Sequence, residues 1–261
     1  MASDTAHGRA THLPPQLADL RRRSREAAVL CDFDGTLAPI VEDPSMARPV
    51  PGTLTVLRAL VERFRLVAVV SGRPASFLAA HLPVPGLTRA GSYGLEQVTD
   101  AGVTEVAGAS AWRLAVGEVA ARAGAAAPPG VVVEDKGLSV TIHHRGAPAA
   151  AGWVRAFADA QAERSGLVTH AARMSIELRP PIAIDKGTVV SELIAHAGVT
   201  AACVCGDDAG DLPAFAAVAV LPLAVRVAAW SAEAPADLFA AADLVVDGPD
   251  GMLEVLRFLA G

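Results

Sequence analysis

The stretch AAVLCDFDGTL, at residues 27–37, decides the fold expected for the whole chain. Its first five residues form a short apolar run, which is typical of a strand buried on both faces in a parallel sheet covered by helices. Two acidic residues, Asp32 and Asp34, follow the run directly. Because ligands bind at the carboxyl ends of the strands in open α/β sheets, the pair is predicted to lie at a ligand site. Two such carboxylates can also simply belong to a turn.

Strands and helices alternate on both sides of this stretch. A helix predicted over residues 52–63 leads into a second buried strand at 66–70, and together with the first strand they make a βαβ unit. The further elements expected are helices over 75–81, 186–197 and from about Asp211, and strands over 87–90, 201–205, 217–221 and 244–246. The sequence therefore predicts an α/β, Rossmann-like core domain with a parallel sheet and helices on both faces.

The pattern changes between residues 97 and 183. Hairpin-like strands are expected over residues 131–134, 138–143, 167–170 and 174–178, and helices over 111–123 and 149–165. Such a pattern indicates an antiparallel sheet with helices on one side. We therefore expect an inserted α+β cap domain at 97–183, which splits the core into residues 27–96 and 184–261. Residues 1–26 are expected to form a tail and a short helix.

Composition and patterning exclude several classes of partner. With 22 Lys and Arg against 28 Asp and Glu, the net charge is −6, so nucleic acid, which calls for clustered basic side chains, is not an expected partner. The best candidate for a membrane span, residues 212–230, is broken by Pro213 and Pro222, so no span is expected. The first residues lack the basic start and apolar run of a secretory signal, and we expect a cytoplasmic, monomeric protein.

A second acidic group, GDDAGD at residues 206–211, also follows an apolar run. Three carboxylates within five residues repel one another unless a cation or ordered donors compensate, and oxygen ligands suit a hard divalent ion. The alternative is a helix start, where Asp is favoured as a capping residue and by the helix dipole. The residues alone leave both interpretations open.

Two further polar residues stand at element ends of the predicted core. Ser71 follows the strand at 66–70, and with Gly72 beside it a hydroxyl and backbone N–H groups at a helix start can hold a phosphate oxygen or merely cap the helix. Lys186 begins the helix at 186–197, where a lysine is usually a surface residue. Together with the two acidic groups they supply the nucleophile, metal site, hydroxyl and cation that phosphoryl transfer needs.

In this order the four groups resemble the motifs of the haloacid dehalogenase-like phosphatases, and the resemblance covers nearly the whole chain from residue 27. Within that superfamily the chain resembles the trehalose-6-phosphate phosphatase family. The segments that carry this resemblance are DFDGTLAPI at 32–40, VSGRP at 70–74, GSYGLE at 91–96, EDKG at 134–137, HHR at 143–145 and ELRP at 177–180. The chain departs from the family pattern at Tyr93, Gly210 and Leu212, where the family usually has His, Thr and Glu.

The resemblance implies a mechanism for the site. Asp32 would attack phosphorus to form an aspartyl-phosphate, and Asp34 would act first as the acid and then as the base. Ser71 and Lys186 would hold the phosphate oxygens. The ligands implied for Mg²⁺ are the carboxylates of Asp32 and Asp207, the backbone carbonyl of Asp34 and, through water, Asp208.

The inserted domain is expected to close over the site as a lid and to bind the sugar. The substrate-binding residues that the resemblance implies are Gly72, Arg73, Lys136, His144, Arg145, Glu177, Arg179 and Asp211. His143 and His144 alternate faces on a strand, so only one of them can point at the substrate, and we choose His144.

The implied activity is Mg²⁺-dependent hydrolysis of trehalose 6-phosphate to trehalose and phosphate, a step of trehalose biosynthesis. The partner would be a small-molecule sugar phosphate. Alternatives within the fold are phosphatases for a sucrose, glucosylglycerol or mannosylglycerate phosphate. One alternative from another class is a phosphomutase, which would return the phosphoryl group to a sugar. Another is an inactive binding partner of a sugar-phosphate-forming enzyme. Such a partner would not need Asp32 and Asp34 together with Asp207 and Lys186.

Overall fold

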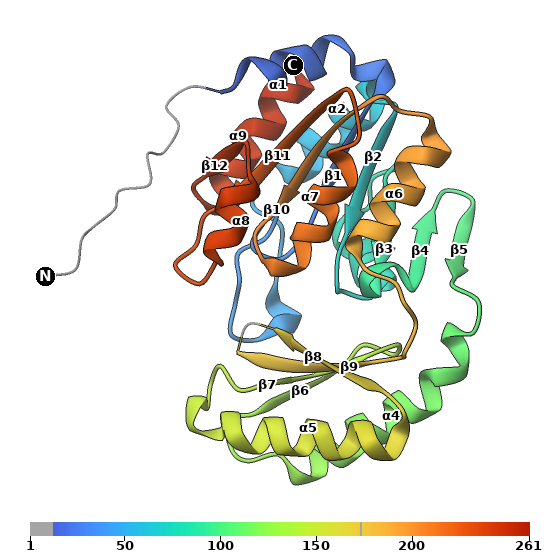
Figure 1. The fold of residues 1–261 in the computed structure, drawn as a ribbon, viewed down its shortest axis with the longest axis vertical. Coiled ribbons are helices and arrows are strands. Elements are labelled where there is room, and N and C mark those ends of the chain that lie inside the picture. Colours follow the sequence, from blue (N-terminus) through green and yellow to red (C-terminus); the bar gives the residue numbers. More distant parts are fainter. Residues whose placement is uncertain (1–12, 173) are drawn as a thin grey trace, which may run out of the picture.

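The computed structural model describes residues 13–172 and 174–261, which form a large sheet and a small sheet that lies across one edge of the large one (Figure 1). The predicted tail falls in part on residues 1–12, outside the described residues. The large sheet has the strand order β12-β11-β10-β1-β2-β3-β4-β5. Its strands are β1 (Ala27–Cys31), β2 (Leu66–Val70), β3 (Thr88–Gly91), β4 (Glu96–Thr99), β5 (Gly102–Glu105), β10 (Ala201–Gly206), β11 (Leu223–Ala229) and β12 (Leu244–Val246). All pairs from β12 to β3 are parallel, and β4 and β5 add an antiparallel hairpin.

Strand β1 lies in the middle of the parallel part, between β10 and β2. In the register of the sheet, Cys31 at the end of β1 pairs with Cys205 on one side and Val69 on the other. The residues that follow these three strands therefore emerge at the same edge of the sheet. They are Asp32, Asp207 and Ser71.

Helices cover both faces of the large sheet, as predicted. One face is covered by α1 (Pro15–Arg22), α2 (Thr53–Arg63), α3 (Ala75–His81) and α9 (Gly248–Ala260), and the other by α6 (Lys186–Ala197), α7 (Leu212–Val218) and α8 (Ala236–Ala241). Successive side chains of β1 enter opposite cores: Val29 packs on the first face and Leu30 on the second, both at most 1% exposed. Burial on both faces explains the uninterrupted apolar run that precedes Asp32.

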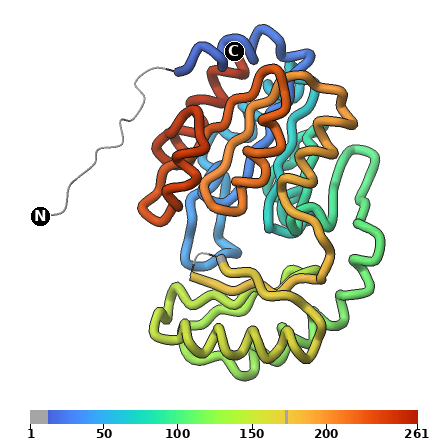
Figure 2. Tube along the Cα trace, viewed as in Figure 1, coloured from blue at the N-terminus to red at the C-terminus, as the bar shows by residue number. Residues whose placement is uncertain are grey.

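The small sheet is antiparallel, with the order β6-β7-β9-β8. Its strands are β6 (Val132–Asp135), β7 (Val140–His143), β8 (Val168–Ala172) and β9 (Ser175–Arg179). The helices α4 (Arg113–Ala126) and α5 (Ala151–Ser165) pack on one face against Ile142, Ile176 and their apolar neighbours. The other face is turned toward the carboxyl edge of the large sheet (Figures 1 and 2). The expected α+β architecture is thus confirmed.

Figure 2 traces the chain as it leaves the large sheet after β5 and returns from β9 to α6. The predicted start of the insertion, residue 97, lies within β4, which pairs with β3. We propose instead that the cap begins after β5. Short 3₁₀ helices complete the fold: η1 (Ser24–Glu26), η2 (Pro44–Met46), η3 (Ser92–Gly94), η4 (Ala109–Trp112), η5 (Pro148–Ala150) and η6 (Ala209–Asp211).

The strand predicted over residues 217–221 is wrong. Helix α7 continues to Val218, and the strand of this region is β11, which starts after Pro222. The side chains of Ala214, Phe215 and Val218 form the buried face of α7, and a short apolar run does not distinguish such a helix face from a buried strand. Among the described residues, none of the helices has the length and apolar character needed to cross a membrane.

Candidate active site

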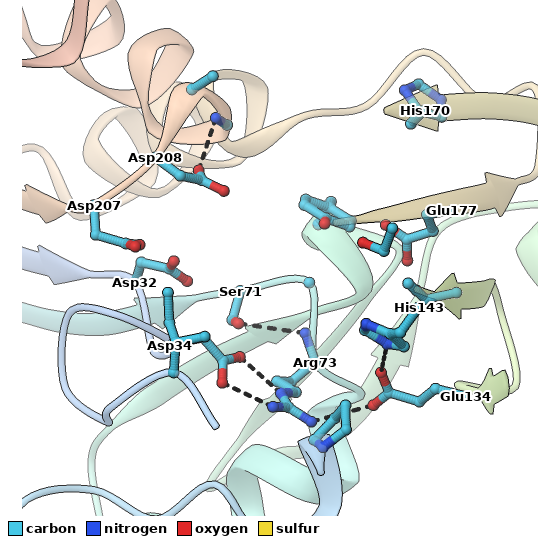
Figure 3. Close-up of a pocket in the computed structure, with 18 of the residues that line it drawn as sticks. Asp32, Asp34, Ser71, Arg73, Glu134, His143, His170, Glu177, Asp207 and Asp208 are labelled. Atoms are coloured by element: carbon cyan, nitrogen blue, oxygen red, sulfur yellow. Dashed lines mark hydrogen bonds and ion pairs between the residues drawn. The ribbon is translucent and has the colours of Figure 1, made fainter. Parts of the chain in front are cut away.

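A cavity of about 480 Å³ lies between the carboxyl edge of the large sheet and the open face of the small sheet (Figure 3). The large-sheet side contributes Asp32, Asp34, Ser71, Gly72, Arg73, Tyr93, Lys186, Asp207 and Asp208 to the lining. The small-sheet side contributes Glu134, Lys136, Thr141, His143, Arg145, His170, Ser175, Glu177 and Arg179. Both lysines of the chain line this one cavity.

The loop after β1 presents Asp32 and Asp34 on the same side. Phe33 between them is fully buried in the apolar core, which turns its two neighbours toward the cavity. The backbone N–H of Asp32 donates to the carbonyl of Cys205 (2.9 Å), and that of Gly35 donates to the carbonyl of Ala38 (2.7 Å). The first bond fixes the loop to β10, and the second closes the turn that follows.

Three carboxylates come together at the edge between β1 and β10. One oxygen from each of Asp32, Asp207 and Asp211 lies within 4.8 Å of the others, and all three residues are buried. The Oδ1 atom of Asp32 is buried and has no hydrogen-bond partner among the described residues. A buried, unbonded carboxylate oxygen beside a second carboxylate fits a hard divalent cation such as Mg²⁺, which prefers oxygen ligands.

Asp208 and Asp211 cap the helical turn at η6. The Oδ1 atom of Asp208 accepts from the backbone N–H of Gly210 (2.8 Å), and Oδ2 of Asp211 accepts from the N–H groups of Asp207 (2.9 Å) and Asp208 (3.1 Å). Both interpretations of the acidic group thus have support, since two of its acids cap a helix and Asp207 stands beside Asp32. Asp211, predicted to bind substrate, is only 2% exposed, and its carboxylate is directed at the backbone and Lys186.

Lys186 is a buried cation, not a surface residue. It is 3% exposed, and its Nζ lies 3.0 Å from Oδ2 of Asp32 and 2.7 Å from Oδ1 of Asp211. Burial by itself lowers the pKa of Lys186, but the charges of Asp211 and Asp32 outweigh it and hold the pKa well above its usual value. The ammonium group therefore stays charged next to the candidate nucleophile.

The charge of Asp32 is sensitive to its surroundings. Burial raises the pKa of Asp32 to about 7, while Lys186 acts in the opposite direction and the nearby carboxylates add to the rise. A cation held between Asp32 and Asp207 would favour the ionised carboxylate.

Arg73 connects the core to the cap. Its Nε and Nη2 donate to the two carboxylate oxygens of Asp34 (2.7 and 2.8 Å), and its Nη1 donates to Glu134 of β6 (3.1 Å; Figure 3). The guanidinium carbon lies 4.7 Å from the ring centre of Phe77. Arg73 is predicted to bind substrate, and in this arrangement it also fixes the orientation of Asp34.

The open face of the small sheet carries paired charges. Glu177 is 2% exposed, and its Oε1 accepts from Ser139 Oγ (2.6 Å) and lies 3.2 Å from Lys136 Nζ. His143 Nε2 lies 3.0 Å from Oε2 of Glu134. Burial raises the pKa of Glu134, but the bond with His143 and the charges of Lys136 and Arg73 bring it to about 2. These polar groups face the predicted phosphate site.

His143, and not the predicted His144, lines the cavity within the described part of the chain. Val140 and Ile142 of β7 pack against the helices, so the alternate residues Thr141 and His143 face the cavity. The backbone N–H of His144 instead donates to the carbonyl of Met174 (2.8 Å) just beyond the strand. The apolar residues at 140 and 142 were the signal that could have decided between the two histidines.

Arg145 closes the far side of the cavity. Its guanidinium donates to both carboxylate oxygens of Glu233 (2.7 and 2.9 Å), which stands in the core loop between β11 and α8. Sequence reasoning did not select Glu233, Glu134 or His170 as site residues. Glu134 follows Val133 on β6, and Val133 packs with the apolar residues on the helix side, whereas no local pattern marks His170 or Glu233.

Gly35 is needed for the carboxylates to come this close. Its φ is +75°, and an added Cβ would lie 2.0 Å from Oδ2 of Asp207. Replacing Gly35 with Ala is expected to displace Asp207 and lower kcat/KM by about 10²-fold, the usual effect of misplacing a catalytic group by about 1 Å. Gly117→Ala on α4, where an added Cβ meets no described atom within 4 Å, is the matched control and should keep the wild-type kcat/KM. Equal activities of the two variants would contradict this role of Gly35.

Comparison with known proteins identifies similar sequences. A family model described as trehalose-phosphatase matches residues 30–234. The trehalose-phosphate phosphatase of Mycobacterium tuberculosis is 36% identical over 248 residues, which are 91% of this chain and 62% of that protein. The one from Mycobacterium leprae is 34% identical over 255 residues, 91% of this chain and 58% of that protein. The chain thus spans little more than half the length of these curated relatives.

Solved structures share the fold. A trehalose-6-phosphate phosphatase related protein superimposes with a TM-score of 0.77 at 24% identity, covering 89% of this chain and 96% of that one. The C-terminal domain of the Candida albicans trehalose-6-phosphate phosphatase gives a TM-score of 0.76 at 22% identity, covering 95% and 96%. A haloacid dehalogenase-like hydrolase from Bacteroides thetaiotaomicron gives 0.64 at 18% identity, covering 89% and 99%. The fold is therefore that of the haloacid dehalogenase-like hydrolases, with an inserted cap.

Proposed function

Because the chain belongs to the trehalose-phosphatase family, we propose that it hydrolyses trehalose 6-phosphate to trehalose and inorganic phosphate. The observation that carries the proposal is the convergence of Asp32, Asp207, Ser71 and Lys186 at one sheet edge, under a cap face lined with polar side chains. A nucleophile, oxygen ligands and a buried cation at one point are the parts that phosphoryl transfer uses. We propose a monomeric protein with a sugar phosphate as its small-molecule partner.

In the proposed mechanism, a carboxylate oxygen of Asp32 attacks phosphorus and the bond from phosphorus to the sugar oxygen breaks. Asp34 gives a proton to the leaving oxygen, which requires it to exchange one of its bonds with Arg73 for a bond with the sugar. Asp34 then takes a proton from the water that cleaves the aspartyl-phosphate. The second step returns Asp32 and Asp34 to their starting states.

The phosphate oxygens need compensation for their charge. Lys186, whose Nζ lies 3.0 Å from Asp32, and Ser71, which follows the neighbouring strand β2, would hold the non-bridging oxygens. Asp32, Asp207, the backbone carbonyl of Asp34 and Asp208 would hold Mg²⁺, which when bound neutralises phosphate charge so that an anionic nucleophile can approach. The cap residues Lys136, Glu177, Arg179, Arg145 and His143 would bind the sugar.

A panel of phosphate esters tests this function. Phosphate release would be measured with trehalose 6-phosphate, sucrose 6-phosphate, glucosylglycerol phosphate and mannosylglycerate phosphate, with Mg²⁺ and after its removal by a chelator. We expect the highest kcat/KM for trehalose 6-phosphate and no turnover without a divalent ion. A higher kcat/KM for another ester would identify that ester as the substrate instead. Transfer of phosphate to a second sugar without release would indicate a phosphomutase. Full turnover after chelation would contradict the metal site.

Arg73 provides a further test of the proposed acid. Replacing Arg73 with Lys keeps the charge but removes the planar two-pronged contact with Asp34. We expect kcat/KM to fall by about 10²-fold because Asp34 is no longer held in position. Arg155→Lys, at an exposed position of α5, is the control and should keep wild-type kinetics. Wild-type kinetics for Arg73→Lys would show that the contact with Asp34 does not matter to the reaction.

A further inference from the structure

The turn after β3 holds its backbone in an uncommon conformation. Ser92 and Tyr93 have φ angles of 49° and 59°, and among the described residues only Met174 shares a positive φ without being glycine. Bulky side chains rarely adopt this region, and such strain persists where the surroundings fix it, often at a functional site. Here the backbone N–H of Tyr93 donates to the carbonyl of Ser71 (2.9 Å), and that of Ser92 donates to the carbonyl of Arg73 (2.8 Å). These two bonds connect the strained turn directly to residues 71–73, which are predicted to hold the phosphate and are called the phosphate loop below.

The ring of Tyr93 lies against the phosphate loop on one side. A Cβ added to Gly72 would be 2.6 Å from the ring carbon that bears the hydroxyl and 2.6 Å from the hydroxyl oxygen itself. Only glycine at position 72 leaves room for the ring in this place. Tyr93 also lines the cavity, between the core and the cap.

On its other side Tyr93 contacts two charged residues of the cap. The guanidinium carbon of Arg179 lies 4.0 Å from the centre of the Tyr93 ring, and the Tyr93 hydroxyl is close enough to Glu177 to help to lower the pKa of that carboxyl. Burial raises the pKa of Tyr93 well above its usual value, so its phenol remains a neutral donor. Burial also raises the pKa of Glu177, but the charges of Lys136 and Arg179 outweigh it, so Glu177 remains a carboxylate acceptor.

Arg179 has donors to spare in this arrangement. Its Nε is buried without a hydrogen-bond partner in the described residues, and the distance from Nε to Oε2 of Glu177 is 3.9 Å. A cation–π contact engages the face of a guanidinium, whereas its N–H donors lie in its plane. Tyr93 therefore supports Arg179 without occupying the donors that a sugar hydroxyl or a phosphate oxygen would accept from.

We propose that Tyr93 is a specificity-determining residue that positions Arg179 and Glu177 over the phosphate loop, so that the site prefers phosphate esters of polyhydroxylated sugars over esters without hydroxyl groups. The inference rests on the proposed phosphatase function and deepens it. It gives a role to one of the three positions at which the chain departs from the family pattern. Tyr93 acts through Arg179 and Glu177 and takes no part in the bond-breaking steps.

The test compares two substrates across three single variants and one double variant. Tyr93→Phe removes the hydroxyl beside Glu177 and keeps the ring, Tyr93→Leu removes both the hydroxyl and the ring, and Arg179→Ala removes the supported cation. For each protein kcat and KM are measured with p-nitrophenyl phosphate and with the sugar phosphate that the wild-type enzyme hydrolyses fastest. The readout is the ratio of kcat/KM for the sugar phosphate to that for the aryl phosphate, which a general loss of folded protein does not change.

We expect the ratio to fall about tenfold in Tyr93→Leu, mainly through KM for the sugar phosphate, and about threefold in Tyr93→Phe. Tyr93→Leu combined with Arg179→Ala should lower the ratio by less than the product of the two single effects, since only the loss of the hydroxyl beside Glu177 adds to the loss of Arg179. An unchanged ratio in Tyr93→Leu and Tyr93→Phe, or fully additive effects, would overturn the proposal. Failure of the proposed function would appear separately, as a wild-type enzyme that hydrolyses the aryl ester and no sugar phosphate.

Discussion

Asp32→Asn is expected to lower the rate of phosphate release by at least about 10⁴-fold, as is usual when a nucleophile is removed. The amide fills the same buried space but carries no charge with which to attack phosphorus. Phosphate release from trehalose 6-phosphate at saturating Mg²⁺ measures the effect. Asp159→Asn, at an exposed position of α5, is the matched control and should retain wild-type activity. Full activity of Asp32→Asn would rule out Asp32 as the nucleophile.

The same variant also tests the electrostatics through stability. The pKa of Asp32 is raised from 3.8 to about 7 in the folded protein. Between these two pH values the unfolded chain has released the proton and the folded chain has not, so the contribution of Asp32 to stability falls as pH rises. Metal-free Asp32→Asn has no titrating group at position 32, so it does not lose stability in this way as pH rises. Above pH 7 its melting temperature should therefore equal or exceed that of the metal-free wild type, and a lower value would contradict the raised pKa.

Lys186→Met is expected to impair both stability and activity. The substitution keeps an unbranched side chain, one atom shorter, but leaves Asp32 and Asp211 buried without their cation. Breaking a buried ion pair by removing one partner lowers the free energy of unfolding by about 3 to 5 kcal/mol. Loss of the cation that would hold phosphate should lower kcat by at least about 10³-fold. Denaturant unfolding and phosphate release measure the two effects.

A double variant separates the two consequences of losing Lys186. Adding Asp32→Asn to Lys186→Met removes one of the unpaired carboxylates, so part of the lost stability should return. Activity should not return, because the nucleophile is absent. If Lys186→Met alone unfolds like the wild type and turns over at the wild-type rate, Lys186 has neither role.

Local signals explain what could be predicted from the sequence. The apolar run before Asp32 is buried on both faces, and parallel pairing of β1 with β10 and β2 brings the residues after these strands to one edge. Helix α6 begins at Lys186 because Asp185 caps it through the N–H of Thr188 (2.8 Å). The acidic motif, the helix cap at Asp185 and the strand ends are each encoded within a few residues, so they could be recognised without tertiary information.

Contacts between distant segments could not be predicted in the same way. The pair of Lys186 with Asp211 joins the start of α6 to η6, and the link from Asp34 through Arg73 to Glu134 crosses from the core to the cap. Nothing in the local sequence indicates that Arg145 meets Glu233 or that Tyr93 supports Arg179. These contacts depend on how the cap sits over the core. Arg73 was therefore assigned to the substrate without its bond to Asp34.

Chemical trapping of the phosphorylated carboxylate tests the central claim most directly. Enzyme in excess over trehalose 6-phosphate would be quenched with borohydride, which reduces an acyl-phosphate to an alcohol and so converts a phosphorylated aspartate to homoserine. Peptide mass spectrometry then locates the product. We predict homoserine at position 32, formed only when substrate and Mg²⁺ are both present and absent from Asp32→Asn. Turnover with an unmodified Asp32, or homoserine at Asp207 instead, would contradict the account.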